Sequence, residues 1–244
     1  MTLRLFFHSD DLKANVEVLD CTPHENEFAV VLRATLFHPQ GGGQPCDTGW
    51  IGESQVLRVV QEPGRIVHFV DRAVSPGMTR IDIDEPRRQL NSRLHSAGHL
   101  IGHFAETLGW VPVKGHHWPG ESRVTFKPGQ APTEFDSATI QNALDRWTSA
   151  DLPRLTSLRE GAREISFGEL PAYGCGGTHV RRTGDIGAFV LLGDSASSAG
   201  VRRIEALTGQ AALDHLRAQD ARLADVAAVL KASVADVVDR VKVL

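Results

Sequence analysis

Two pairs of metal-ligand side chains stand out in this sequence, because the members of each pair are four residues apart. His95 and His99 form the first pair, and Cys175 and His179 form the second, much further along the chain. Three imidazole nitrogens and one thiolate sulfur are a donor set that suits tetrahedral zinc. We therefore expect these four residues to bind one Zn²⁺ ion.

The first pair lies in a segment with a strong helical pattern. Apolar residues recur at helical spacing over residues 87–108, after a proline at position 86 that is well placed in a first helical turn. Residues four apart share one face of a helix, so both imidazoles can reach one ion. The HxxxH spacing alone is weak evidence, and Ser96 stands where the HExxH protease motif has glutamate.

The second pair lies in a glycine-rich turn, Cys175-Gly176-Gly177-Thr178-His179. Four protein ligands would favour a closed zinc site that only fastens this turn to the helix. The small hydroxyl groups of Ser96 and Thr178, set among glycines, favour a substrate pocket instead. We keep both interpretations open and take Thr178 and Ser96 as the candidate catalytic residues.

Residues 1–86 have the pattern of a small β-domain or barrel. Segments rich in Val, Ile, Leu and Phe alternate with Pro, Gly, Asn or Asp, which predicts strands at 3–7, 15–19, 27–37, 54–60, 66–70 and 78–83. Between them, residues 38–45 (HPQGGGQP) contain three consecutive glycines. Such a backbone can adopt positive φ and approach another segment closely, so the run is either a flexible loop or a functional one.

Residues 87–209 have the mixed pattern of an α+β domain. After the first helix, we expect strands near 111–113, 123–126, 164–167, 188–192 and 201–206 and a helix near 133–150. The predicted fold class of the whole chain is therefore α+β: an N-terminal β-barrel-like domain, a middle domain and a helical tail.

The tail, residues 210–244, has apolar residues every seven positions, which are Leu216, Leu223, Leu230, Val237 and Leu244. This repeat is typical of a coiled coil or a helical hairpin. Ser233 and Asp236 could cap a second helix, so we favour a hairpin broken near Ala232. The apolar stripe either packs on its own domain or serves self-association or a partner helix.

Composition excludes several classes of protein. The 244 residues are 41% hydrophobic and 23% charged, and no apolar run approaches the roughly 18 residues of a membrane-spanning helix. The N-terminus lacks a secretory apolar segment, and three cysteines do not make a disulfide framework, so we expect a cytoplasmic protein. The net charge of −4 argues against a nonspecific polyanion binder. Residues 87–209 carry a small positive charge, so this segment should face any nucleic acid.

Four motifs in order resemble a known family, the editing region of alanyl-tRNA synthetase. They are residues 36–45 with Asp47-Thr48-Gly49, His95 with His99, residues 175–179 (CGGTH), and residues 200–209 (GVRRIEALTG). Because the chain is short and shows no aminoacylation domain, it is most similar to the free-standing editing proteins of the AlaX group, in their medium-length class. The likeness covers roughly residues 1–209.

The resemblance implies hydrolysis of tRNA(Ala) mischarged with serine, with glycine as a second candidate. It also implies an N-terminal barrel-like domain that carries the glycine-rich loop, and an editing domain that holds zinc through His95, His99, Cys175 and His179. Relatives often have threonine at a position where this chain has Gly98, so a hydroxyl group is missing there.

The partner implied is the acceptor end of tRNA(Ala), which phosphate contacts and contacts to the unpaired 3′ terminus should hold. We take as candidate substrate-binding residues those of the glycine-rich loop and several basic or aromatic ones, namely Gly41, Gly42, Gly43, Gln44, Lys114, His117, Arg181, Arg202 and Arg203. Two other functions stay open. One is a tRNA-binding or partner-docking module with purely structural zinc, and the other is a zinc hydrolase of small amino-acid esters or amides.

Overall fold

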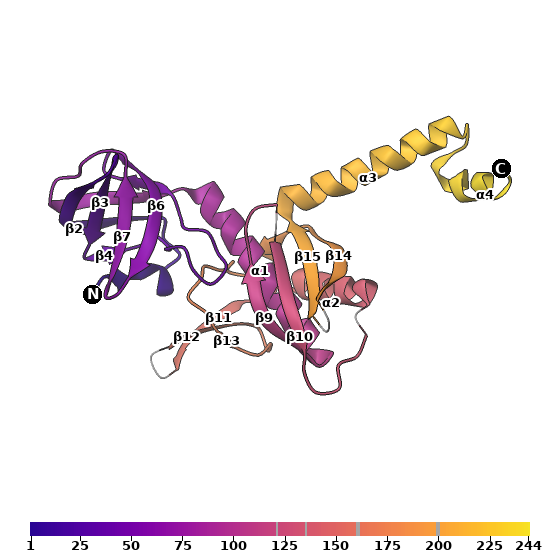
Figure 1. Ribbon diagram of the computed structural model, residues 1–244, viewed down its shortest axis with the longest axis horizontal. Coiled ribbons are helices and arrows are strands. Elements are labelled where there is room, and N and C mark those ends of the chain that lie inside the picture. The colour runs from indigo at the N-terminus through magenta and orange to yellow at the C-terminus, as the bar shows by residue number, and fades with distance from the viewer. Residues whose placement is uncertain (121, 135, 160–161, 199–200) are drawn as a thin grey trace.

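The computed structural model describes residues 1–120, 122–134, 136–159, 162–198 and 201–244, with residues 194–198 described by their backbone. Its elements combine helices and strands, so the α+β prediction is confirmed. Three parts follow one another along the long axis: a β-structure, a mixed centre and a projecting helix (Figure 1). Among the described residues, none of the helices has the length and apolar character needed to cross a bilayer.

The N-terminal part is a ring of strands. Its elements are β1 (Leu3–Arg4), the 3₁₀ helix η1 (Leu5–Phe7), β2 (Lys13–His24), β3 (Glu27–Leu32), β4 (Ala34–Thr35), β5 (Gly49–Ile51), β6 (Ser54–Glu62), β7 (Arg65–Val70) and β8 (Gly77–Ile83). Six strands pair in the closed order β2-β3-β7-β6-β5-β8, and β8 pairs back with β2. Side chains such as Val18, Leu32, Val56 and Ile81 are buried inside the ring.

Two predicted strands of this part differ from the structure. The strand predicted at 3–7 ends at Arg4, after which η1 turns Phe6 into the core. The strand predicted at 27–37 ends at Leu32, because the chain then leaves the ring and β4 pairs with β1 in parallel. A hydrophobic pattern alone does not reveal such a change of partner.

The central part packs helices on a four-stranded sheet. Helix α1 (Glu85–Thr107) and α2 (Ser137–Ser149) accompany strands in the order β14-β15-β10-β9, which are Phe189–Ser198, Val201–Thr208, Ser122–Pro128 and Trp110–His116. Ala97, Leu100 and Phe104 of α1 pack in one core with Phe126 and Ile204 of the sheet. The predicted helices at 87–108 and 133–150 are confirmed, the second over a shorter span.

A second sheet of the centre carries the turn with the second metal-ligand pair. It comprises β11 (Arg154–Arg159), β12 (Ala162–Phe167) and β13 (Tyr173–Gly174), in that order. Cys175 follows β13 directly, and a short 3₁₀ helix, η2 (Thr183–Ile186), follows the turn. Strands β11 and β13, like β5 in the ring, have no counterpart among the predicted strands.

A buried ion pair joins the ring to α1. Arg88 of α1 donates to both carboxylate oxygens of Asp47, with its Nε 3.0 and 3.1 Å from them, and to the carbonyl of Leu36. The Arg88 side chain is 8% exposed and that of Asp47 is fully buried. Because residues 36 and 47 flank the glycine-rich loop, this ion pair fixes the loop relative to α1.

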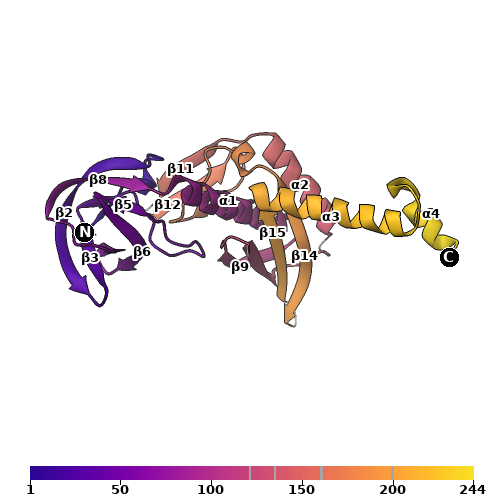
Figure 2. The same cartoon turned by 90° about the horizontal axis from the view of Figure 1, so that it is seen from above.

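The tail begins with α3 (Gly209–Val229), which extends away from the centre in both views (Figures 1 and 2). The chain then turns at residues 230–233 and continues as η3 (Val234–Asp236) and α4 (Val237–Lys242). Ser233 is the N-cap of η3, and its hydroxyl donates to the Asp236 carboxylate across 2.6 Å. Leu216 and Leu223 of the apolar stripe are 45% and 42% exposed, so they do not pack on the central part.

Candidate metal centre

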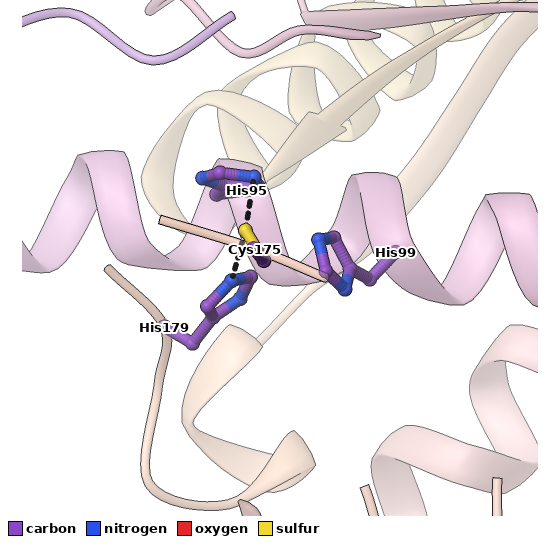
Figure 3. A group of neighbouring side chains, drawn as sticks. All are labelled: His95, His99, Cys175 and His179. Atoms are coloured by element: carbon purple, nitrogen blue, oxygen red, sulfur yellow. Dashed lines mark hydrogen bonds between the residues drawn. The ribbon is translucent and has the colours of Figure 1, made fainter. Parts of the chain in front are cut away.

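The four predicted ligands meet at one point, although they come from distant parts of the sequence. His95 and His99 project from α1, and Cys175 and His179 face them from the turn after β13 (Figure 3). One donor atom from each residue lies within 4.8 Å of the other three. The Cys175 sulfur lies 3.4 Å from His95 Nε2 and 3.2 Å from His179 Nε2.

Helix α1 presents its two imidazoles from a well-defined start. The Asp84 carboxylate caps the helix by accepting a hydrogen bond from the Arg87 N–H, and Pro86 lies in the first turn. The helix then runs through the core, where its apolar face fixes its rotation. His95, only 3% exposed, is held one turn before His99 on the buried side.

Arg163 shapes the turn that carries the second pair. Its Nη1 donates to the carbonyls of Cys175, at 3.1 Å, and of Gly177, at 2.7 Å, while its own carbonyl accepts from the Cys175 N–H. A Cβ atom at Gly177 would lie 2.1 Å from Cε1 of His95, far inside van der Waals contact. Glycine at this position therefore lets the turn lie directly against the His95 ring.

Gln44, in the glycine-rich loop, determines the tautomer of His95. Its Oε1 accepts the Thr178 N–H at 3.0 Å, and its Nε2 lies 2.9 Å from the Thr178 hydroxyl, which fixes the orientation of the amide. The same Oε1 lies 2.7 Å from His95 Nδ1. An amide oxygen only accepts, so Nδ1 carries the proton and Nε2 presents its lone pair toward Cys175.

Ser96 contacts the Nδ1 atom of His179, as Gln44 contacts the Nδ1 atom of His95. Its hydroxyl oxygen accepts from the Val180 N–H at 3.1 Å and lies 3.1 Å from His179 Nδ1. The Ser96 side chain is fully buried behind the imidazole, on the side away from Cys175. A hydroxyl in this place orients a ligand, whereas the Thr178 hydroxyl bonds Gln44 and accepts from Ser92 at 2.8 Å.

Burial keeps the imidazoles of the cluster neutral. It lowers the pKa of His99 to about 3, with His103, His117 and Arg163 adding to the effect. Burial likewise lowers the pKa of His95 and His179 well below the usual value, and neighbouring histidines act in the same direction. Neutral imidazoles have a free lone pair, which a metal ligand requires.

The pKa of the Cys175 thiol is shifted in the opposite direction, above its usual value. Burial raises its pKa, and the Gly177 N–H and the Arg163 guanidinium act against that rise. His99 Nδ1 is also buried, with no hydrogen-bond partner among the described residues. Three imidazole nitrogens and one sulfur that converge in this way could hold a metal ion, and the unpaired Nδ1 atom of His99 is consistent with a missing partner at this site.

His117 accounts for the glycine at position 98. A Cβ atom on Gly98 would lie 2.2 Å from Cε1 of His117, and one on Gly115 would lie 2.5 Å from its Nε2. The His117 ring, 4% exposed, stacks on the His95 ring with centroids 4.5 Å apart. The imidazole thus occupies the space in which a side chain at position 98 would lie.

Several of the predicted substrate-binding residues belong to the glycine-rich loop. Gly43 accepts the His117 N–H on its carbonyl at 2.8 Å, and a Cβ on Gly42 would lie 4.0 Å from His95 Cε1, so the glycine-rich loop lies beside the cluster. Gly41 pairs with Gln44 across the tip of this loop. Lys114 is exposed on β9.

The predicted arginines differ in their partners and in the face of the sheet that they occupy. Arg181 is 70% exposed and pairs with Asp10. Arg202 and Arg203 are consecutive in β15, so their side chains point to opposite faces of the sheet. Because Ile204 and Ala206 face the α1 core, Arg202 is on that face and Arg203 is on the other. The two arginines therefore cannot line the same surface, and Gly200, which begins their motif, lies outside the described residues.

Sequence reasoning missed four contributors to the site. Arg163, Ser92 and the orienting role of Gln44 carry no local signal, because their contacts are made with residues far away in the chain. His103, one turn beyond His99, was missed as well, and its ring stacks on Tyr173 with centroids 4.2 Å apart. The four-residue spacing from His99 could have pointed to it.

Comparison with known proteins relates this chain to aminoacyl-tRNA synthetases. Residues 163–205 match the family described as the threonyl and alanyl tRNA synthetase second additional domain. An alanine–tRNA ligase of Cereibacter sphaeroides is 36% identical over 94% of this chain and 31% of its own length. Those of Granulibacter bethesdensis and Paracoccus denitrificans are 35% and 33% identical over 94% and 88% of this chain. The chain thus spans about three-tenths of the length of these relatives.

Proposed function

We propose that this chain, which is related over most of its length to part of alanine–tRNA ligases, is an aminoacyl-tRNA deacylase that removes serine from mischarged tRNA(Ala). Glycine is the second candidate for the amino acid removed. The observation that carries the proposal is the convergence of His95, His99, Cys175 and His179 in a chain with this relationship. The activity would belong to the cytoplasm, where tRNA is charged.

We infer that the cofactor is Zn²⁺. In a tetrahedral site with bonds of about 2.0 to 2.3 Å, ligand atoms lie roughly 3.3 to 3.6 Å apart. The sulfur-to-nitrogen distances of 3.4 and 3.2 Å are near this range. When bound, zinc would supply Lewis-acid polarisation of the ester carbonyl or of a water molecule.

The chain's own residues would hold and orient the reacting groups. Gln44 and Ser96 keep the His95 and His179 rings in place, each through the Nδ1 atom that faces away from Cys175. The Thr178 hydroxyl accepts from Gln44 and Ser92, which leaves its own proton free to donate. We propose that Thr178 contacts the aminoacyl group and that Ser96 is a positioning residue.

A deacylation site separate from the aminoacylation site of a synthetase has a clear physical purpose. Serine is larger than alanine by one hydroxyl group. The apolar amino-acid pocket of a synthetase rejects such a difference by only about 1 to 3 kcal/mol. A site that hydrogen-bonds the serine hydroxyl discriminates in the opposite sense, because alanine would leave a buried polar group unpaired. Buried hydroxyls and imidazoles around the cluster are suited to that task.

We further propose three regions, 1–86, 87–209 and 210–244, with different tasks. The first contributes the loop with Gly41, Gly42, Gly43 and Gln44, and the second contributes the ligands and the tRNA contacts. The exposed Leu216 and Leu223 make the third a candidate surface for self-association.

A tRNA-binding or docking module is the second candidate, because four protein ligands are typical of structural zinc sites. The deciding experiment incubates the zinc-loaded protein with Ser-tRNA(Ala) and with Ala-tRNA(Ala) and measures the amino acid released. Selective release of serine, lost in Cys175→Ala, supports the deacylase. Tight binding without turnover supports the module, and equal turnover of small serine esters supports a general ester hydrolase.

A further inference from the structure

The His99 ring is held differently from the other two imidazoles of the cluster. Gln44 contacts the Nδ1 atom of His95, and Ser96 contacts the Nδ1 atom of His179. The buried Nδ1 atom of His99 has no hydrogen-bond partner within the described part of the chain. Because the outer torsion of a histidine side chain has only a broad preference, neighbouring groups must set the plane of this ring.

Two parallel rings border the His99 imidazole. Tyr173 and His103 stack with centroids 4.2 Å apart and planes 8° from parallel. Both rings are steeply inclined to the His99 ring: Tyr173 at 70° with a centroid distance of 5.4 Å, and His103 at 78° with a centroid distance of 6.5 Å. Edge-to-face contacts between aromatic rings at such distances are favourable beyond the area that they bury. The stacked pair therefore favours one plane of the His99 imidazole.

Further contacts keep Tyr173 in place. Its hydroxyl donates to the Glu106 carboxylate, and its backbone pairs with that of the buried Ile165 between β13 and β12. His103 and Glu106 follow His99 by four and seven residues, so the three side chains share one face of α1. Tyr173 is thus attached to the same helix face that carries His99.

The place of Tyr173 in the chain connects the two pairs of ligands. It precedes Cys175 by two residues, while its hydroxyl and ring contact α1. His99 and Cys175 are only partly buried, whereas His95 and His179 are buried. Tyr173 therefore connects the two ligands that the surrounding protein encloses least.

We propose that Tyr173 is the positioning residue of His99. Its ring, held by His103 and Glu106, fixes the plane of the imidazole and with it the direction of the nitrogen lone pair at the cluster. Tyr173 would then raise metal affinity without being a ligand, and outer contacts of this kind are commonly worth about 10- to 100-fold in affinity. This inference rests on the proposed function, since it concerns the metal centre on which that function depends.

The test is a double-mutant cycle on metal affinity, so that it does not depend on hydrolysis. Titration of the full chain with Co²⁺ measures the affinity, and the absorption bands report the geometry. The variants are Tyr173→Leu, which removes the ring but keeps an apolar side chain, His99→Ala, which leaves three ligands, and their combination.

Trp147→Leu is the matched control. Trp147 is also a partly buried aromatic residue that packs against the central core, but its ring contacts that of Phe104. The control thus removes a comparable ring from the same core at a place away from the ligands.

We expect Tyr173→Leu to weaken cobalt binding by about tenfold or more and to alter the tetrahedral bands, while the thiolate band persists. In the His99→Ala background, the same substitution should change the affinity little, because the ring that it positions is gone. Tyr173→Phe keeps the ring and loses only the bond to Glu106, so it should recover most of the affinity. Trp147→Leu should bind cobalt as the unaltered chain does.

Three results would overturn the proposal: an equal loss of affinity with and without His99, an equal affinity of Tyr173→Leu and Trp147→Leu, or a Tyr173→Phe variant that binds as weakly as Tyr173→Leu. Failure of the proposed function would look different, because the chain would show the expected cobalt affinities but release no serine from Ser-tRNA(Ala). An unaltered chain that binds no tetrahedral cobalt would contradict both.

Discussion

The Nδ1 atom of His95 lies 2.7 Å from the Oε1 atom of Gln44, and this contact connects the glycine-rich loop to the candidate metal centre. The loop belongs to the strand ring, whereas His95 belongs to α1. The same Gln44 also binds the backbone N–H and the hydroxyl of Thr178. The side-chain amide of Gln44 therefore positions the α1 histidine and the Cys175–His179 turn relative to each other. The three preceding glycines allow the loop to lie close to both.

Replacement of Gln44 by leucine should weaken metal binding. His95 would lose the acceptor that fixes its tautomer, and such outer contacts are worth about 10- to 100-fold in affinity. Competition with a chelator measures the change. Gln40→Leu, in the exposed part of the same loop, is the matched control. Equal affinity of the two variants would contradict the orienting role of Gln44.

Gly98→Ala should destabilise the fold because of His117. The new Cβ would lie 2.2 Å from the His117 ring, and such overpacking costs about 1 to 3 kcal/mol. Combining it with His117→Ala should remove most of that cost, which a double-mutant cycle of denaturant unfolding would measure. Gly102→Ala is the control, because its Cβ would make ordinary contacts with Tyr173 at 3.6 Å and Pro112 at 3.9 Å, and alanine favours a helix. A Gly98→Ala cost that is the same with and without His117 would refute the explanation.

Breaking the ion pair between Arg88 and Asp47 should have a large cost. Arg88→Met would leave the fully buried Asp47 carboxylate without its partner, at about 3 to 5 kcal/mol of unfolding free energy. Arg33→Met removes an exposed ion pair with Glu17, which water and salt screen, and should change the unfolding free energy far less. Chemical denaturation compares the two variants. Similar costs would mean that the buried pair does not join the ring to α1.

Acid should destabilise the ring through His68. Burial lowers its pKa from 6.5 to about 4, and the neutral imidazole is hydrogen-bonded to Thr35 and Val30. Between these pH values the unfolded chain binds a proton that the fold does not, so the unfolding free energy falls as the pH falls. The full effect of this residue is roughly 3 kcal/mol.

Unfolding curves from pH 7 to pH 4 test this prediction. His68→Gln should show a shallower decline with acid than the unaltered chain, even if it is less stable at pH 7. An unchanged slope in His68→Gln would show that this imidazole does not link stability to pH.

Much of the fold and the ligand set could be predicted from local patterns. The apolar repeat placed α1 within two residues of its observed ends, and the two four-residue spacings identified the cluster. Strands β11 and β13 were missed, because β11 is mostly exposed and β13 has two residues, so neither has a hydrophobic pattern. The Gln44 and Arg163 contacts arise only when distant segments fold together.

Gly98 illustrates a different limit. In the sequence, it is notable only because it lacks the hydroxyl group that relatives often have at this position between the two histidines. In the fold, its meaning depends on His117, a residue on the strand side of the site that no spacing rule connects to it. The neighbouring Ser96 likewise looked like a residue of the reaction, whereas its hydroxyl lies against His179 Nδ1.

Cobalt substitution tests the shared metal ion most directly, because Co²⁺ adopts tetrahedral sites and its absorption reports both geometry and thiolate ligation. We expect one Co²⁺ per chain, with tetrahedral bands and a thiolate charge-transfer band that disappears in Cys175→Ser. Loss of tetrahedral character is expected in His95→Ala and His179→Ala. A cobalt spectrum that is octahedral, or that keeps its thiolate band without Cys175, would contradict the four-ligand centre.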